Sequence, residues 1–213
     1  MTPLLVILSA PSGTGKTTIA RALRTSRDDV GFSISATTRA RRDGEEEGVD
    51  YFFLTANAFQ RKIDAEEFVE WARYGKERYG TLASEVRRIL DSGKHAVLDI
   101  EIQGARMVRE RVANVVSIFI LPPSAEALQE RLAGRSTEDD EALAARLALA
   151  VEELEAAPEY DYIVVNEDRA QAVADVAGII DAESHRASRL TDLDATIERL
   201  GDELENLARS TKA

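Results

Sequence analysis

The sequence predicts an α/β fold with a doubly wound parallel sheet. Apolar, strand-like runs alternate with helical patterns along most of the chain, as expected for strands joined by crossover helices. The first run, residues 4–8, leads through a glycine-rich turn directly into a helical pattern. The 213 residues, 44% of them apolar, can bury one core, which we expect from residues 1–34 and 84–213 around an insertion at 35–83. In such a sheet, ligands bind at the carboxyl ends of the strands.

The glycine-rich turn, residues 9–18, has the spacing of a phosphate-binding loop. Backbone N–H groups and the positive end of the following helix form an anion cradle, in which Lys16 reaches the outer phosphates and Thr17 can ligate magnesium. Gly13 and Gly15 provide the backbone freedom that close approach to phosphate requires. The alternative is a glycine-rich surface turn with an accidental lysine, and the strand before the turn and the helix after it argue against that.

The segment after the first helix combines a short strand, expected at residues 32–35, with a basic loop. Arg39, Arg41 and Arg42 form the most basic patch of an acidic chain. Because arginine matches the geometry of phosphate and carboxylate, one interpretation is a site for a second phosphate-bearing ligand. The other is that these arginines pair with the glutamates at 45–47.

The insertion reads as short strands and helices of mixed character. Strands are expected at 51–54 and 68–73, with a helix between them that begins after Thr55. Glu70 lies among large apolar residues of the second strand, where a carboxylate needs a partner. A helical pattern that ends at Gly93 returns the chain to the main sheet.

The strand expected at residues 96–101 ends in two acids, Asp99 and Glu101. A carboxylate at a strand tip can face magnesium-bound phosphate, and the alternative is that it caps the following helix. The near-continuous apolar run at 115–121 indicates a buried parallel strand. The last strand of the core is expected at 162–166.

Three arginines lie in two helical patterns joined by a polar turn, at about residues 125–150. Arg131, Arg135 and Arg146 resemble the arginines of a flap that swings over phosphates. Spacing alone favours the alternative, in which they pair with neighbouring glutamates.

The last stretch, about residues 170–213, reads as helical and carries an apolar stripe. Its members alternate at spacings of three and four, which is a heptad pattern: Leu190, Leu193, Ile197, Leu200, Leu204 and Leu207. Such a stripe must be covered, either by the core of the same chain or by another subunit. Folding back is the commoner solution in general; for this chain we expect a homodimer.

Composition excludes several classes of function. A net charge of −12 argues against a broad surface for nucleic acid or anionic membranes. The chain has no cysteine, which excludes disulfides and thiolate metal sites, and its two histidines are too few for a zinc site. The apolar start is too short to span a bilayer, so we expect a cytoplasmic protein.

Several stretches together are far more specific than the phosphate-binding loop. They are residues 9–17, 35–39, 50–53, 68–72, 79–81, 98–104, 118–124 and 160–162. In this order they resemble the bacterial guanylate kinases, nucleoside monophosphate kinases of the P-loop type, over about residues 4–190. The resemblance implies a P-loop kinase core with an inserted GMP-binding subdomain and a helical lid.

The resemblance also implies a reaction, the Mg²⁺-dependent transfer of the γ-phosphoryl group of ATP to GMP, and roles for individual residues. It assigns to the ATP side Ser12, Gly13, Thr14, Gly15, Lys16, Thr17, Thr18, Arg131 and Arg135, with Thr17 on the metal. It assigns to GMP Ser35, Arg39, Arg42, Tyr51, Glu70, Tyr79, Thr81, Asp99 and Glu101. Catalytic roles fall to Lys16, Arg39, Arg135 and Arg146.

The role of Glu70 in reading the base is consistent with the chemistry of guanine. Guanine presents N1–H and an amine side by side, which one carboxylate accepts together, whereas adenine presents an acceptor at N1. Adenine would leave the charge of Glu70 unpaired, at a cost of several kcal/mol. The hydroxyls of Ser35 and Thr81 can bond to guanine O6 or its amine, and Thr81 can also cap the next helix.

Two other functions are weighed against this one. A guanylate-kinase-like protein-binding module without catalysis is disfavoured by the intact phosphate loop and the flap arginines. A kinase for another nucleoside monophosphate is not expected to hold Glu70 in its base site. Four features depart from the expected patterns. Ala10 stands where the phosphate-loop pattern has glycine, Arg41 and Asp43 flank Arg42 where proline is usual, Glu101 replaces an aspartate, and residues 76–78 replace a Gly-Asn-Tyr type of stretch.

Overall fold

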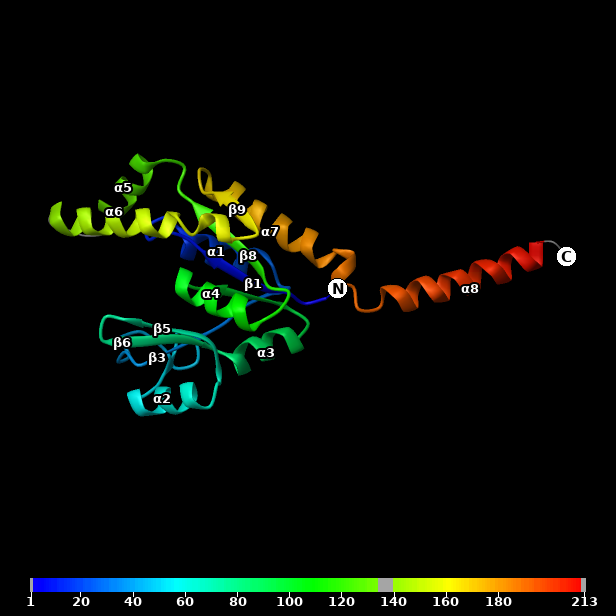
Figure 1. The fold of residues 1–213 in the computed structure, drawn as a ribbon, viewed down its shortest axis with the longest axis horizontal. Coiled ribbons are helices and arrows are strands. Elements are labelled where there is room, and N and C mark those ends of the chain that lie inside the picture. The colour runs from blue at the N-terminus through cyan, green and yellow to red at the C-terminus, as the bar shows by residue number, and fades with distance from the viewer. Residues whose placement is uncertain (1, 134–139, 212–213) are drawn as a thin grey trace.

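The computed structural model describes residues 2–133 and 140–211, which form two β-sheets and their covering helices (Figure 1). The main sheet has five strands, all parallel, in the order β2-β7-β1-β8-β9. Their bounds are β1 Leu5–Ser9, β2 Val30–Phe32, β7 His95–Asp99, β8 Val116–Leu121 and β9 Tyr162–Val165. The predicted α/β class with a parallel sheet is confirmed.

Helices cover both faces of the main sheet, and the alternation of side chains along β1 explains how. Val6 and Leu8 point to a core shared with α1 (Lys16–Ser26) and α7 (Arg169–Ser184). Ile7 points the other way, to a core shared with α3 (Ala83–Asp91) and α4 (Ile102–Arg111). A strand buried on both faces is mostly apolar, which is why β1 and β8 read as near-continuous apolar runs.

The second sheet has four strands in the order β4-β3-β6-β5 and is mixed. Its strands are β3 Ser35–Thr37, β4 Phe52–Phe53, β5 Phe68–Tyr74 and β6 Glu77–Leu82. Helix α2 (Ala56–Asp64) packs on it through Phe59, whose ring stacks on that of Phe68 with centroids 4.5 Å apart. Thr55 caps α2 as expected, since its side chain accepts a hydrogen bond from the N–H of Ala58.

The single strand expected at residues 32–35 is wrong. Phe32 ends β2 beside Val97 in the main sheet, whereas Ser35 begins β3 beside Thr81 in the second sheet. The chain passes from one sheet to the other between these two residues. One apolar-polar alternation in the sequence thus belongs to two strands with different partners.

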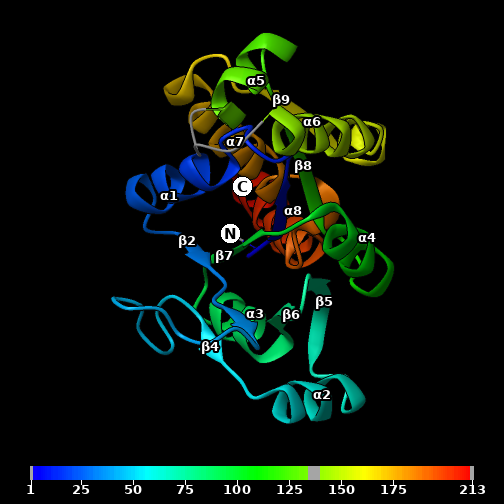
Figure 2. The same ribbon diagram turned by 90° about the vertical axis from the view of Figure 1, so that its left-hand side faces the viewer.

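The remaining helices lie beyond the carboxyl end of β8 and along the end of the chain. Helices α5 (Ala125–Ala133) and α6 (Asp140–Leu154) pack together through Leu128, Leu132 and Ala150. Figure 2 shows them at one end of the molecule, with the second sheet and α2 at the other. Short 3-10 turns occupy Ala157–Glu159 and Ala187–Arg189.

The helical tail is interrupted and does not fold back. Helix α7 ends at Ser184 and α8 spans Leu193–Thr211, so the stretch expected to be helical from residue 170 is helical except for a break between these two helices. Figure 1 shows α8 extending away from the two sheets, and none of its residues is buried. Covering of the apolar stripe by the core of the same chain is therefore contradicted. Within the described ranges, no helix is both long and apolar enough to cross a membrane.

Candidate active site

The phosphate loop joins β1 to α1 with two glycines in the left-handed region. Gly13 has φ 85° and Gly15 has φ 101°, so the expected need for glycine at both positions is confirmed. A Cβ on Gly15 would also lie 2.7 Å from Nδ2 of Asn166. Both the backbone conformation and the crowding therefore restrict position 15 to glycine.

Two side chains hold this loop by donating hydrogen bonds to one of its carbonyl oxygens. Thr14 O accepts hydrogen bonds from Nδ2 of Asn166 at 2.7 Å and from the Arg131 guanidinium at 2.9 Å. Arg131 also donates to the carbonyl of Asn166 at 3.1 Å. The side chain of Arg131, expected on the ATP side, thus contacts the backbone of the loop. The contribution of Asn166 was missed, although its position directly after a core strand places it at the carboxyl edge of the sheet.

Lys16 connects the loop to the tip of β7. Its Nζ donates to Ile100 O at 2.7 Å and lies 2.9 Å from Oδ1 of Asp99 and 4.0 Å from Oε1 of Glu101. Glu101 immediately precedes α4 but makes no side-chain capping bond, so the capping alternative is not realised by Glu101. Both strand-tip carboxylates instead face the loop lysine.

A cavity of about 320 Å³ lies beside this lysine and contains most of the residues predicted for GMP. Its lining includes Ser35, Tyr51, Glu70, Tyr79, Asp99 and Glu101. A second cavity, of about 260 Å³, is lined by Thr17 and Thr81 and shares Ser35, Tyr51 and Asp99 with the first. The two cavities adjoin, so residues from both sheets and from the phosphate loop converge on one region.

Glu70 is the buried acid of this region, only 5% exposed. Its Oε1 accepts a hydrogen bond of 2.6 Å from the hydroxyl of Thr81 on the neighbouring strand. Burial raises the pKa of Glu70, and the hydrogen bond from Thr81 opposes that shift. Helix α3 starts after Leu82 without a side-chain cap, so the expected capping role of Thr81 is wrong; its hydroxyl serves Glu70.

Gly104, on α4, is a site residue that the motif analysis did not single out. A Cβ at this position would lie 2.8 Å from Oε2 of Glu70. Gly104 therefore lets α4 approach the buried carboxylate closely. A glycine inside a helix normally costs stability, and that cost is the signal that marks position 104 as special.

Replacing Gly104 with alanine tests this close approach. We expect the KM for GMP to rise about tenfold, because the new methyl group pushes the Glu70 carboxylate out of its bonded position. The melting temperature should change by only a few degrees, because the gain in helix propensity from alanine offsets part of the cost of displacing the buried carboxylate. Gly178 on α7, with nothing near its Cβ position, provides the control: Gly178→Ala should leave KM unchanged. An unchanged KM in Gly104→Ala would show that the contact is unimportant.

The basic loop after β3 holds Arg39 between an acid and two aromatic rings. Its guanidinium binds both carboxylate oxygens of Glu45, at 2.6 and 3.0 Å. It also lies 5.3 Å from the ring centroid of Tyr51 and 5.8 Å from that of Phe53. The predicted pairing with a nearby glutamate is thus present for Arg39. Arg42 is exposed, and its backbone N–H donates to Glu45.

The flap arginines are placed only in part. Arg135 lies outside the described residues. Arg146, on α6, donates to the carbonyl of Leu132 on α5 at 3.3 Å. That bond keeps Arg146 at the junction of the two helices.

The arrangement of the loop at the carboxyl edge of a parallel sheet, with a polar cavity beside its lysine, defines the class. The chain is a P-loop kinase. The family model described as "Guanylate kinase" matches residues 2–183. The chain belongs to the guanylate kinase family.

Individual relatives agree over most of the chain. The guanylate kinase of Symbiobacterium thermophilum is 46% identical over 186 residues, which are 87% of this chain and 88% of the relative. That of Halalkalibacterium halodurans is 45% identical and covers 88% of this chain and 92% of the relative. The crystal structure of guanylate kinase from Anaplasma phagocytophilum aligns with a TM-score of 0.75 at 33% identity, covering 93% of this chain and 95% of that one.

Proposed function

We propose that this protein transfers the γ-phosphoryl group of ATP to GMP, giving ADP and GDP, and that it does so in the cytoplasm. The observation that carries the proposal is the buried carboxylate of Glu70, held by Thr81 in a cavity that opens beside Lys16. A buried acid without a cationic partner is costly unless a ligand with paired donors completes its hydrogen bonds. Guanine offers that pair through N1–H and its amine.

Residues 35–83 form the GMP-binding insertion in this proposal, and the phosphate of GMP lies near Arg39. The phosphate of GMP is bound by Arg39, Arg42, Tyr51 and Tyr79. The resting structure supports this role for Arg39, because its guanidinium is already presented in a fork to an anionic group, the Glu45 carboxylate. Binding of GMP exchanges Glu45 for phosphate as the partner of Arg39. The tyrosines are positioned by an edge-on contact, with their ring centroids 6.0 Å apart.

The phosphates of ATP lie in the loop, held by the N–H groups of residues 13–18 and by Lys16. A cavity of about 390 Å³ on the flank of the loop, lined by Arg131 and Asn166, provides space for the rest of the nucleotide. Thr17 and Asp99 line one cavity and supply hydroxyl and carboxylate oxygens, the donors that suit Mg²⁺. Thr17 would hold the ion, which neutralises charge on the transferred phosphate.

The chain has little covalent work to do in this reaction. It holds the two phosphates in line, excludes water and stabilises the charge on the migrating group. The accepting oxygen of GMP is already anionic, so no general base is needed. We propose that the insertion and the lid, about residues 125–150, close over both nucleotides and bring Arg135 and Arg146 to the phosphates.

We also propose a homodimer through α8, whose apolar face has no cover in the described chain. Ile197, Leu200, Leu204 and Leu207 are each 45–65% exposed and follow a heptad pattern. Light scattering at micromolar concentration should give twice the mass of one chain. Leu204→Asp should give the monomer mass, whereas Ala195→Asp, on the opposite face of the helix, should not. A monomeric wild-type protein would contradict the homodimer.

The function is tested by measuring ADP release with five acceptors in turn: GMP, dGMP, AMP, CMP and UMP. We expect turnover with GMP to exceed turnover with AMP, CMP and UMP by orders of magnitude. Absence of turnover with every acceptor would indicate a binding module. A preference for a base other than guanine would assign a different acceptor.

A further inference from the structure

A carboxylate of helix α6 reaches the phosphate loop at Ser12, which the resemblance assigns to the ATP side but whose backbone N–H is not among those of residues 13–18 proposed for the phosphates. Oε2 of Glu153 accepts a hydrogen bond of 3.0 Å from the backbone N–H of Ser12. The two residues are 141 positions apart, so the bond joins the loop to a distant segment of the chain. Ser12 stands at the outer start of the loop, just before the N–H groups assigned to the phosphates of ATP.

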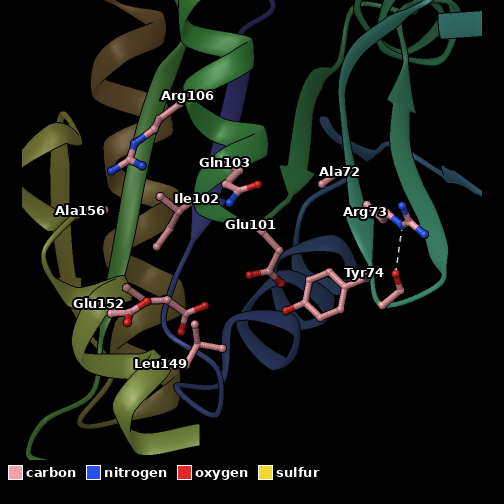
Figure 3. A pocket seen from close by; sticks show the side chains of 12 residues that line it. Ala72, Arg73, Tyr74, Glu101, Ile102, Gln103, Arg106, Leu149, Glu152 and Ala156 are labelled. Carbon is pink, nitrogen blue, oxygen red and sulfur yellow. Dashed lines mark hydrogen bonds between the residues drawn. The ribbon is translucent and has the colours of Figure 1, made fainter. Parts of the chain in front are cut away.

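The surroundings of Glu153 are unfavourable for a negative charge. It lines a cavity of about 460 Å³ together with the end of β5, the start of α4 and α6. Figure 3 shows Tyr74 and Glu101 pointing toward one another across this cavity. Partial burial and the charge of Glu101 both raise the pKa of Glu153, against the opposing effect of the Ser12 N–H and of Lys16. A carboxylate beside incoming phosphates adds repulsion, so its charge does not explain its place. Its capacity to accept a hydrogen bond does.

Glu153 shares a face of α6 with a flap arginine. Arg146 precedes it by seven residues, about two helical turns, so both side chains project from the same side of the helix. A contact that fixes Glu153 against the loop therefore also fixes the direction in which Arg146 faces. The bond to Ser12 is thus placed to couple the loop and the lid helix.

We propose that Glu153 is a positioning residue. By accepting a hydrogen bond from the N–H of Ser12, it holds helix α6 against the start of the phosphate loop. This bond keeps the loop in the shape that binds ATP and fixes the position of α6, the helix that carries Arg146. This inference rests on the proposed use of the loop for ATP. It concerns the ATP side alone and makes no demand on the GMP cavity.

The test compares three variants by calorimetric titration with ATP and by kinetics with GMP. Glu153→Met keeps the length of the side chain but removes the acceptor, and we expect it to raise the Kd and the KM for ATP about tenfold, as for one lost hydrogen bond. Its KM for GMP should change less than twofold. Glu153→Gln keeps an acceptor and loses the charge, so its Kd for ATP should equal or fall below that of the wild type. Glu152→Met, an exposed neighbour on the same helix, is the matched control and should match the wild type.

Two results would overturn the inference: an unchanged Kd for ATP in Glu153→Met, or a loss in Glu153→Gln as large as in Glu153→Met. Melting temperatures identify any variant that fails to fold, and Glu153→Ala then replaces Glu153→Met. Binding of ATP is measured without turnover. Failure of this inference is therefore distinct from failure of the proposed reaction, which would appear as a wild-type protein that binds ATP but does not phosphorylate GMP.

Discussion

Replacing Lys16 with alanine is expected to lower kcat about 10²- to 10³-fold, the largest loss for any single substitution considered. The amine lies between the tip of β7 and the phosphate loop, 2.9 Å from Asp99. In the proposed mechanism, the outer phosphates of ATP take the place of Asp99 as the partner of this amine. Without Lys16, the charge that develops during transfer has no fixed cation from the loop, while the carboxylates of Asp99 and Glu101 remain.

Two measurements distinguish this loss of activity from loss of the fold. The melting temperature of Lys16→Ala should fall by only a few degrees, because Asp99 is partly exposed and can be hydrated. Lys62→Ala removes a lysine that pairs with Glu67 at 2.6 Å on the surface of the insertion, far from the phosphate loop along the chain. This control should keep full activity. A near-normal kcat in Lys16→Ala would refute the role of the loop.

Replacing Glu70 with glutamine should reduce kcat/KM for GMP about 10²-fold and narrow the discrimination between GMP and AMP. A carboxylate accepts both donors of guanine, whereas a glutamine amide accepts one and turns its own N–H₂ toward the other. That same N–H₂ suits the acceptor at N1 of adenine. The ratio of kcat/KM for GMP to kcat/KM for AMP should therefore fall by a larger factor than the loss of one neutral hydrogen bond would cause.

Glu67→Gln is the matched control for Glu70→Gln. Glu67 lies three residues earlier, is exposed, and pairs with Lys62 outside the cavity. Glu67→Gln should leave kcat/KM unchanged for both GMP and AMP. If Glu70→Gln discriminates between GMP and AMP as well as the wild type does, Glu70 has no part in reading the base.

Much of the fold follows from local patterns in the sequence. The strands buried on both faces are predictable, because such strands are apolar along nearly their whole length. The phosphate loop is predictable because glycines and a lysine at motif spacing follow a strand-like run and precede a helical pattern. Residues 32–35 were misassigned because strand propensity does not specify which sheet a residue joins. That choice depends on distant partners, Val97 for Phe32 and Thr81 for Ser35.

The contacts that complete the site could not be read from spacing. Gly104 matters because α4 meets Glu70 across the junction of the two sheets, and Glu153 matters because α6 returns to the loop 141 residues after Ser12. Both contacts depend on tertiary geometry. For Arg39 the sequence left two partners open, a phosphate-bearing ligand or a glutamate at 45–47. Short-range spacing permits both partners, and the structure determines which of them the arginine contacts when no nucleotide is bound.

A crystal structure of the protein with GMP tests the central claim most directly. We expect guanine N1–H and its amine to lie within hydrogen-bonding distance of the Glu70 carboxylate, with the phosphate against Arg39 in place of Glu45. A base bound away from Glu70, with Arg39 still paired to Glu45, would contradict it.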